Sequence, residues 1–90
     1  MTHRVKVKLD GNHHAIVDAI LAAGYRVQTL SQGMGVPDLL IADGRTGRMW
    51  LVEVKMPGEP LTDYQRKWAS LWPIPVIVAH TPEEALAGVR

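Results

Sequence analysis

Apolar residues recur along the chain with two different periods, and each period predicts one type of element. Near the amino terminus, Ile16 and Ile20 lie four positions apart, which is the spacing of a helix with one face in a core. Gly11 and Asn12 open this helix, and Asn12 is a favourable N-cap residue. Gly24 is a typical C-terminal stop, so we expect the first helix to end just before it.

The next apolar segments are short, as is typical of strands. We expect strands at residues 25–30, 38–42 and 48–55. The last of these has consecutive apolar side chains, which indicates burial on both faces of a sheet. Residues 43–47 (Asp-Gly-Arg-Thr-Gly) have turn composition, so the second and third strands should form an antiparallel hairpin.

A second helical pattern begins at Thr62, which is followed three residues later by Gln65 in the spacing of a capping box. Its apolar positions form one stripe at Tyr64, Trp68, Leu71 and Trp72. A fourth strand is expected at residues 75–79. A last helix should begin at residues 81–82, where a threonine precedes a proline.

The expected order is therefore helix, three strands, helix, strand, helix. This order predicts an α/β fold with a mixed β-sheet flanked by helices. The fourth strand follows a helical crossover and should run parallel to its neighbour. The length of 90 residues predicts a single domain over residues 1–90.

Composition narrows the class of protein. There is no cysteine, so disulfides and thiolate metal sites are excluded. No apolar run approaches the roughly 20 residues that span a bilayer, and the charged amino terminus does not resemble a secretory signal. We expect no membrane partner and a cytoplasmic protein, in a bacterial or phage-infected cell.

Basic residues are concentrated at the amino terminus, although the net charge is only +1. Arg4, Lys6 and Lys8 alternate with apolar residues within residues 1–10. These three residues are candidates for contacting a nucleic-acid backbone. The segment is also typical of a solvated basic tail, or of an edge strand whose lysines oppose aggregation, and these interpretations stay open.

The hairpin register brings candidate catalytic residues together. If Asp43 pairs with Arg48 across the turn, Asp38 lies directly opposite Glu53, with Cβ atoms about 5 Å apart. Lys55 follows two residues after Glu53 and therefore shares its face of the strand. Taken singly, these residues are also typical of a strand start and a surface ion pair, but their convergence favours a site.

Two opposed carboxylates destabilise a sheet unless a cation lies between them. The Asp38 and Glu53 carboxylates and the backbone carbonyl of Val54 are oxygen donors of the type that suits Mg²⁺ or Mn²⁺. A divalent ion, a positioned water and the positive charge of Lys55 are what phosphodiester hydrolysis requires.

Three motifs resemble the PD-(D/E)XK nuclease superfamily. They are residues 35–38 (Gly-Val-Pro-Asp), 53–55 (Glu-Val-Lys) and 61–65 (Leu-Thr-Asp-Tyr-Gln). Their spacing is similar to that of small phage-type VRR-NUC (virus-type replication-repair nuclease) domains. The resemblance runs from about residue 12 to residue 86 and implies a restriction-endonuclease-like fold.

The resemblance also implies roles for individual residues. Asp38 and Glu53 would bind the metal together with the carbonyl oxygen of Val54, and Lys55 would be catalytic. Gln65 matches a glutamine that shapes the site, although it could equally serve only as a helix cap.

Many relatives supply a further glutamate from the first helix, and this chain has none there. Asn12 is the candidate metal ligand at that position, because an amide oxygen can reach a metal-bound water.

The histidines and tryptophans give weaker indications of function. His13 and His14 are expected to be exposed, His80 is expected at the surface, and no zinc site is expected. Trp68 and Trp72, four residues apart on one helix, predict core packing or a dimer face, with base stacking as the alternative.

The function implied is that of a Mg²⁺- or Mn²⁺-dependent endonuclease that hydrolyses DNA phosphodiester bonds, with branched or structured DNA such as a Holliday junction as the expected substrate. A symmetric junction requires two active sites, so a homodimer is expected. Two alternatives stay open: a non-catalytic nucleic-acid-binding protein on the same scaffold, and a subunit of a larger phage assembly.

Overall fold

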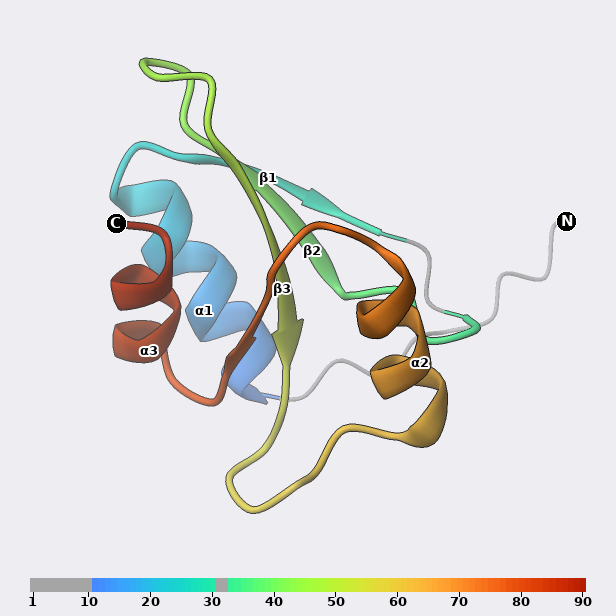
Figure 1. Cartoon of the computed structure of the whole chain (residues 1–90). Helices are drawn as coiled ribbons and strands as arrows, with labels where there is room; N and C mark the ends of the chain where they lie inside the picture. The colour runs from blue at the N-terminus through green and yellow to red at the C-terminus, as the bar shows by residue number, and fades with distance from the viewer. Residues whose placement is uncertain (1–10, 31–32) are drawn as a thin grey trace, which may run out of the picture.

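The computed structural model of the chain describes residues 11–30 and 33–90 (Figure 1). The basic residues Arg4, Lys6 and Lys8 lie outside the described residues, so their proposed contact with nucleic acid stays a prediction. Within the described residues, no helix combines the length and the apolar character needed to cross a membrane.

The order of helices and strands is the predicted one. The elements are α1 (Gly11–Ala22), β1 (Arg26–Thr29), β2 (Leu39–Ala42), β3 (Met49–Val54), α2 (Asp63–Leu71), β4 (Val76–Ala79) and α3 (Pro82–Gly88). Gly24 has a φ of 95°, which few other residues adopt, and this explains why α1 stops where it does.

The four strands form one mixed sheet in the order β1-β2-β3-β4. The pairs β1–β2 and β2–β3 are antiparallel, and β3–β4 is parallel, as the crossover through α2 predicted. In the hairpin, Leu40 pairs with Leu51, and the Asp43 amide donates to the Arg48 carbonyl oxygen at 2.9 Å. The predicted hairpin register is therefore confirmed.

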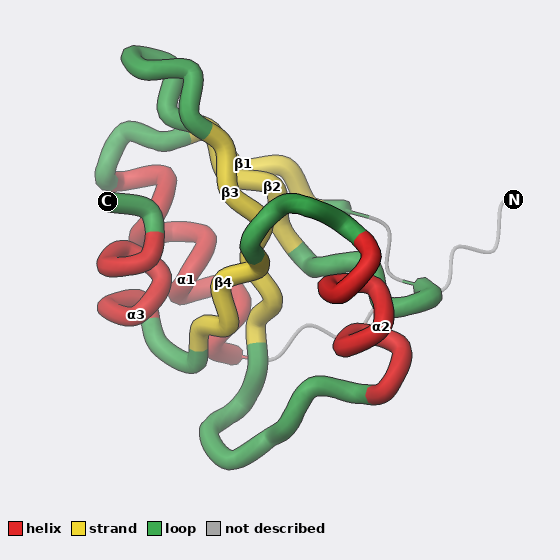
Figure 2. The backbone as a smooth tube through the Cα atoms, viewed as in Figure 1, coloured by secondary structure: helices red, strands yellow, loops and turns green. Residues whose placement is uncertain are grey.

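Helices lie on both sides of the sheet. Figures 1 and 2 show α1 and α3 next to each other on one side and α2 on the other. The core lies between the sheet and the α1–α3 pair, and its buried apolar residues are Ile16, Ile20, Leu39, Ile41, Val52, Val54, Ala79, Ala85 and Val89. On the same side, the hydroxyl of Tyr25 donates a hydrogen bond to the carbonyl oxygen of Val89 at 3.1 Å.

From Leu51 onward, strand β3 is buried on both faces, as predicted. Val52 and Val54 point into the core beneath α1 and α3. Because side chains alternate along a strand, Leu51, Glu53 and Lys55 point to the opposite side, where α2 lies. Residues 51–55 are all buried, so two charged side chains sit in protected positions on that side.

The loop before β2 approaches the first turn of α2 closely at Gly35. A Cβ atom there would overlap the backbone carbonyl of Tyr64, and the φ of Gly35 is 84°. Gly35→Ala is therefore expected to lower the free energy of unfolding by more than about 2 kcal/mol, from overlap and left-handed strain together. Urea denaturation measures this loss.

Two other glycines separate these causes. Gly58 has a φ of 82° with open space around its Cβ position, and Gly44 has open space with no positive φ. Gly58→Ala should show the backbone strain alone, and Gly44→Ala should be nearly neutral. Equal effects at Gly35 and Gly58 would show that the close approach to α2 is unimportant.

Two sequence predictions on side-chain environment were wrong, and one of the two alternatives for α2 is excluded. Asn12 is not an N-cap, because α1 begins at Gly11 and already includes Asn12. His13 is buried, with 5% of its surface exposed, whereas His14 is exposed as predicted. The apolar stripe of α2 was expected in the core or at a dimer face, and the core is excluded because α2 has no buried residue and Trp72 is 51% exposed.

Candidate active site

The predicted pair of carboxylates lies at the open end of the β2–β3 hairpin. Asp38 immediately precedes β2 and is 4% exposed, and Glu53 near the end of β3 is also 4% exposed. Oδ2 of Asp38 accepts a hydrogen bond from the Val54 amide at 2.7 Å. This bond holds the Asp38 carboxylate against β3, at the level of Glu53.

Pro37 explains why the ladder changes at this point. Hydrogen-bonded pairs alternate along an antiparallel hairpin, and the bond between Asp43 and Arg48 sets their phase. Every second pair from Asp43 and Arg48 toward the open end is hydrogen-bonded, and Pro37 and Val54 stand opposite each other at one of these positions. Proline has no N–H to donate to the Val54 carbonyl, and the Asp38 carboxylate takes the Val54 amide. One carbonyl oxygen therefore faces the site without a ladder donor from β2.

The electrostatics of the pair are those of two acids in a protected space. The pKa of Glu53 is raised to about 8, first by burial and then by the hydrogen bond and negative charge of Asp38. The positive charge of Lys55 opposes this rise. Near neutral pH, Glu53 therefore holds a proton that a divalent cation would displace.

Lys55 is the first residue after β3 and is only 5% exposed. Its amide donates to the carbonyl oxygen of Ala79 at 3.0 Å, which extends the parallel pairing with β4 by one step. The site thus places one ammonium group beside Glu53, on the same face of the strand.

Gln65 makes contacts that fit both roles that the sequence left open. Its side-chain oxygen Oε1 accepts a hydrogen bond from the backbone amide of Thr62 at 2.8 Å. The backbone amide of Gln65 donates to Thr62 Oγ1 at 3.1 Å, which completes a capping box. Its Nε2 donates to Oε2 of Glu53 at 3.0 Å. The cap therefore fixes the side chain in the orientation that reaches Glu53.

These two roles can be separated by Gln65→Glu. A glutamate still accepts the hydrogen bond from Thr62 at N3 of the helix, but it cannot donate to Glu53. We expect cleavage activity to fall about 10- to 100-fold, with a small change in melting temperature. Gln65→Ala, which removes both contacts, should lose activity and stability together. If Gln65→Glu retains full activity, the contact with Glu53 has no role in the site.

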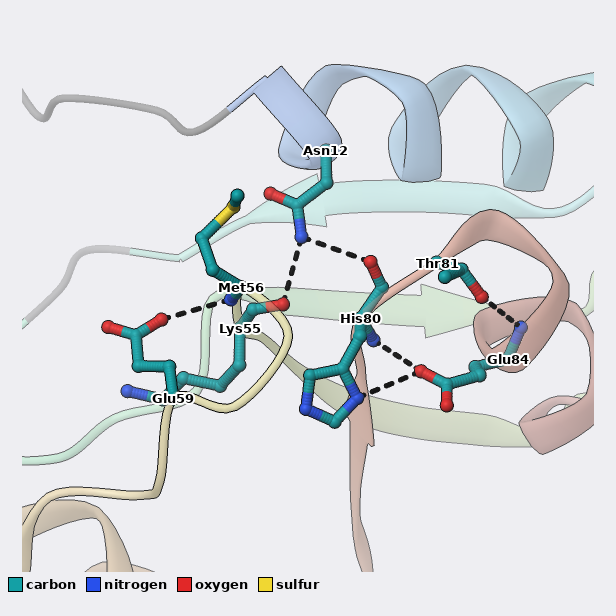
Figure 3. Close-up of polar contacts among 7 residues, drawn as sticks. All are labelled: Asn12, Lys55, Met56, Glu59, His80, Thr81 and Glu84. Atoms are coloured by element: carbon teal, nitrogen blue, oxygen red, sulfur yellow. Dashed lines mark hydrogen bonds and ion pairs between the residues drawn. The ribbon is translucent and has the colours of Figure 1, made fainter.

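Asn12, the candidate ligand from the first helix, lies next to the site, but its hydrogen bonds were not predicted from the sequence. Its Nδ2 donates to the carbonyl oxygens of Lys55 at 2.9 Å and His80 at 3.1 Å (Figure 3). Its Oδ1 is buried and has no hydrogen-bond partner in residues 11–30 and 33–90. The partners are 43 and 68 positions away along the chain, so no local pattern could indicate these contacts.

The donor set fits a hard divalent cation. Residues 11–30 and 33–90 contain no cluster of three or more histidine, cysteine, aspartate or glutamate side chains that could hold a metal. Magnesium commonly uses one or two protein carboxylates and completes its shell with water and substrate phosphate. Asp38, Glu53 and the Val54 carbonyl match that pattern.

Comparisons with known proteins agree with this geometry. The family model of the VRR-NUC domain matches residues 7–72. A solved structure described as a VRR_NUC domain is similar to this chain with a TM-score of 0.71 and 24% sequence identity. The similarity covers 84% of this chain and 87% of that one. A search of curated proteins found no match. The motifs, the mixed sheet and the family match agree, and the chain belongs to the VRR-NUC family of nuclease-type domains.

Proposed function

We propose that this protein is a Mg²⁺- or Mn²⁺-dependent endonuclease that hydrolyses DNA phosphodiester bonds. The observation that carries the proposal is the buried pair of Asp38 and Glu53 with Lys55 beside it. Two carboxylates in protected positions, one with a pKa raised to about 8, are costly to ionise without a cation. Such clusters are common at functional sites.

Each residue has a distinct task in this proposal. Asp38, Glu53 and the carbonyl oxygen of Val54 would hold the metal, which when bound supplies a Lewis acid and lowers the pKa of a coordinated water. Lys55 orients the attacking water and offsets negative charge on the phosphate in the transition state. Gln65 keeps the Glu53 carboxylate in place.

Branched DNA such as a Holliday junction is the proposed substrate, and a homodimer the proposed form. The exposed apolar surface of α2 and the segment after it supports dimerisation. This surface, which we call the α2 surface, contains Tyr64, Leu71, Trp72 and Ile74, which are between 42% and 70% exposed. Next to this surface, the Trp68 ring stacks on the Trp72 ring with centroids 5.2 Å apart. Surfaces of this kind commonly mark interaction sites.

A cleavage assay tests the proposal. Wild-type protein is incubated with a four-way junction, a linear duplex and a single strand of related sequence, in Mg²⁺, Mn²⁺ or EDTA. We expect metal-dependent cleavage with preference for the junction, none with Asp38→Asn, and a dimer in sedimentation analysis. No cleavage of any DNA in either metal would refute the enzyme. DNA binding without cleavage would favour the non-catalytic alternative, and a lone monomer would favour a subunit of a larger assembly.

A further inference from the structure

The backbone around Lys55 is held by groups from several parts of the chain. The Lys55 amide donates to the Ala79 carbonyl at 3.0 Å, and the Lys55 carbonyl accepts from Nδ2 of Asn12 at 2.9 Å. The next amide, that of Met56, donates to Oε1 of Glu59 at 3.0 Å (Figure 3). The peptide groups on both sides of the Lys55 Cα are therefore fixed.

The contact from Asn12 replaces a missing step of the sheet. In a regular parallel ladder, the Lys55 carbonyl would accept from the amide of Thr81. Thr81 is instead the N-cap of α3, where its hydroxyl accepts from the Glu84 amide. The side chain of Asn12 supplies the donor that the strand no longer offers.

The same side-chain amide also binds the residue that follows the neighbouring strand, β4. Nδ2 of Asn12 donates to the His80 carbonyl at 3.1 Å. His80 is held in turn by Glu84, whose Oε1 accepts from the His80 amide at 2.6 Å and lies 2.9 Å from its Nδ1. We call the two bonds from Asn12 the Asn12 clasp. It joins the first turn of α1 to the ends of β3 and β4.

We propose that Asn12 is a positioning residue for Lys55: the Asn12 clasp fixes the peptide that follows Lys55 and thereby the direction in which its ammonium group is presented. This inference rests on the proposed nuclease function, in which Lys55 acts on the water and the phosphate. A lysine side chain has four rotatable bonds, so its backbone must be fixed for its ammonium group to be placed accurately.

The clasp differs chemically from metal ligation by the same residue. The clasp uses the N–H groups of Asn12 as donors to two carbonyl oxygens, whereas a metal ligand uses the side-chain oxygen. Asn12→Asp separates the two roles. A carboxylate would improve a ligand, but facing the carbonyls of Lys55 and His80 it would replace two attractions with repulsion.

The experiment compares Asn12→Ala and Asn12→Asp with the wild type and with His14→Ala, a control at an exposed position of the same helix. Cleavage is measured well below the melting temperature, with DNA affinity measured in Ca²⁺. We expect kcat to fall about 10- to 100-fold in Asn12→Ala and at least as far in Asn12→Asp, with KM and DNA affinity unchanged. His14→Ala should match the wild type.

Two further results decide the inference. Unchanged kcat in Asn12→Ala would overturn it, as would full activity or tighter Mn²⁺ binding in Asn12→Asp, which would assign the side chain to the metal. Amide hydrogen exchange provides a second test that does not depend on cleavage activity. In Asn12→Ala, the amides of Lys55 and Met56 should exchange about tenfold faster or more. If the wild type cleaves no DNA while exchange responds as expected, the proposed function fails but the clasp stands. If it cleaves and exchange does not respond, the clasp alone fails.

Discussion

Lys55→Ala is expected to lower the rate of metal-dependent DNA cleavage by about 100- to 1000-fold. Lys55 is 5% exposed and carries the positive charge that acts on Glu53 in the site. Its removal takes away the charge that would face the phosphate in the transition state. It also raises the pKa of Glu53 further, because Lys55 is the group that lowers it, and this weakens metal binding at neutral pH.

The rate is best measured with enzyme in excess over DNA, so that product release does not hide the chemical step. Lys67→Ala is the matched control, because Lys67 is an exposed lysine of α2 and should not affect the rate. Lys55→Arg keeps the charge in a bulkier and less adaptable form, and should recover only part of the activity. Cleavage by Lys55→Ala at the rate of the Lys67→Ala protein would remove Lys55 from the active site.

The second large effect is on stability in the absence of metal. The pKa of Glu53 is raised from its ordinary value of 4.5 to about 8, so the folded protein binds this proton more tightly than the unfolded chain does. The contribution is fully present below about pH 4.5 and is lost as the pH rises through about 8. In that window we expect the free energy of unfolding to fall by up to about 1.4 kcal/mol per pH unit.

Urea denaturation in EDTA between about pH 5 and pH 8 measures this loss. The glutamine side chain of the Glu53→Gln variant cannot ionise. The histidines titrate in both proteins, so the difference between their free energies of unfolding reports the contribution of Glu53 alone. Asp43 and Glu84, whose pKa values are lowered by hydrogen bonds from Arg45 and His80, act below this window.

Divalent metal should reverse the pH effect. Because Mg²⁺ or Mn²⁺ would bind the ionised carboxylates, adding either ion at about pH 8 should restore stability to the wild type and not to Glu53→Gln. If the free energies of unfolding of the two proteins depend on pH in the same way, with and without metal, then Glu53 neither has a raised pKa nor binds the metal.

The site was predictable where it depends on local rules. The turn between Asp43 and Arg48 and the two-residue period of the strands determine the register, and the register puts Asp38 across from Glu53. The spacing of Thr62 and Gln65 likewise predicted the capping box. In each case the partners are close along the chain, so their geometry follows from the type of element.

The remaining features depend on how distant segments pack. The Asn12 clasp arises where α1 meets the ends of β3 and β4, and nothing near residue 12 in the sequence indicates it. The burial of His13 was likewise not indicated by the sequence. The stripe on α2 was read as core or dimer face, since periodicity shows which residues share a face and not what covers that face. Leu71 is 70% exposed in this chain, which rules out the core and leaves the dimer face as a proposal.

The central claim is that Asp38, Glu53 and the Val54 carbonyl converge on a point that binds a divalent ion. A crystal grown with Mn²⁺, with anomalous scattering recorded to locate the ion, tests it most directly. We expect a peak bounded by the two carboxylates and that carbonyl oxygen, and no peak at this place in Asp38→Asn. A Mn²⁺ ion bound elsewhere with this place empty, or Asp38 turned away from Glu53 in that crystal, would contradict the account.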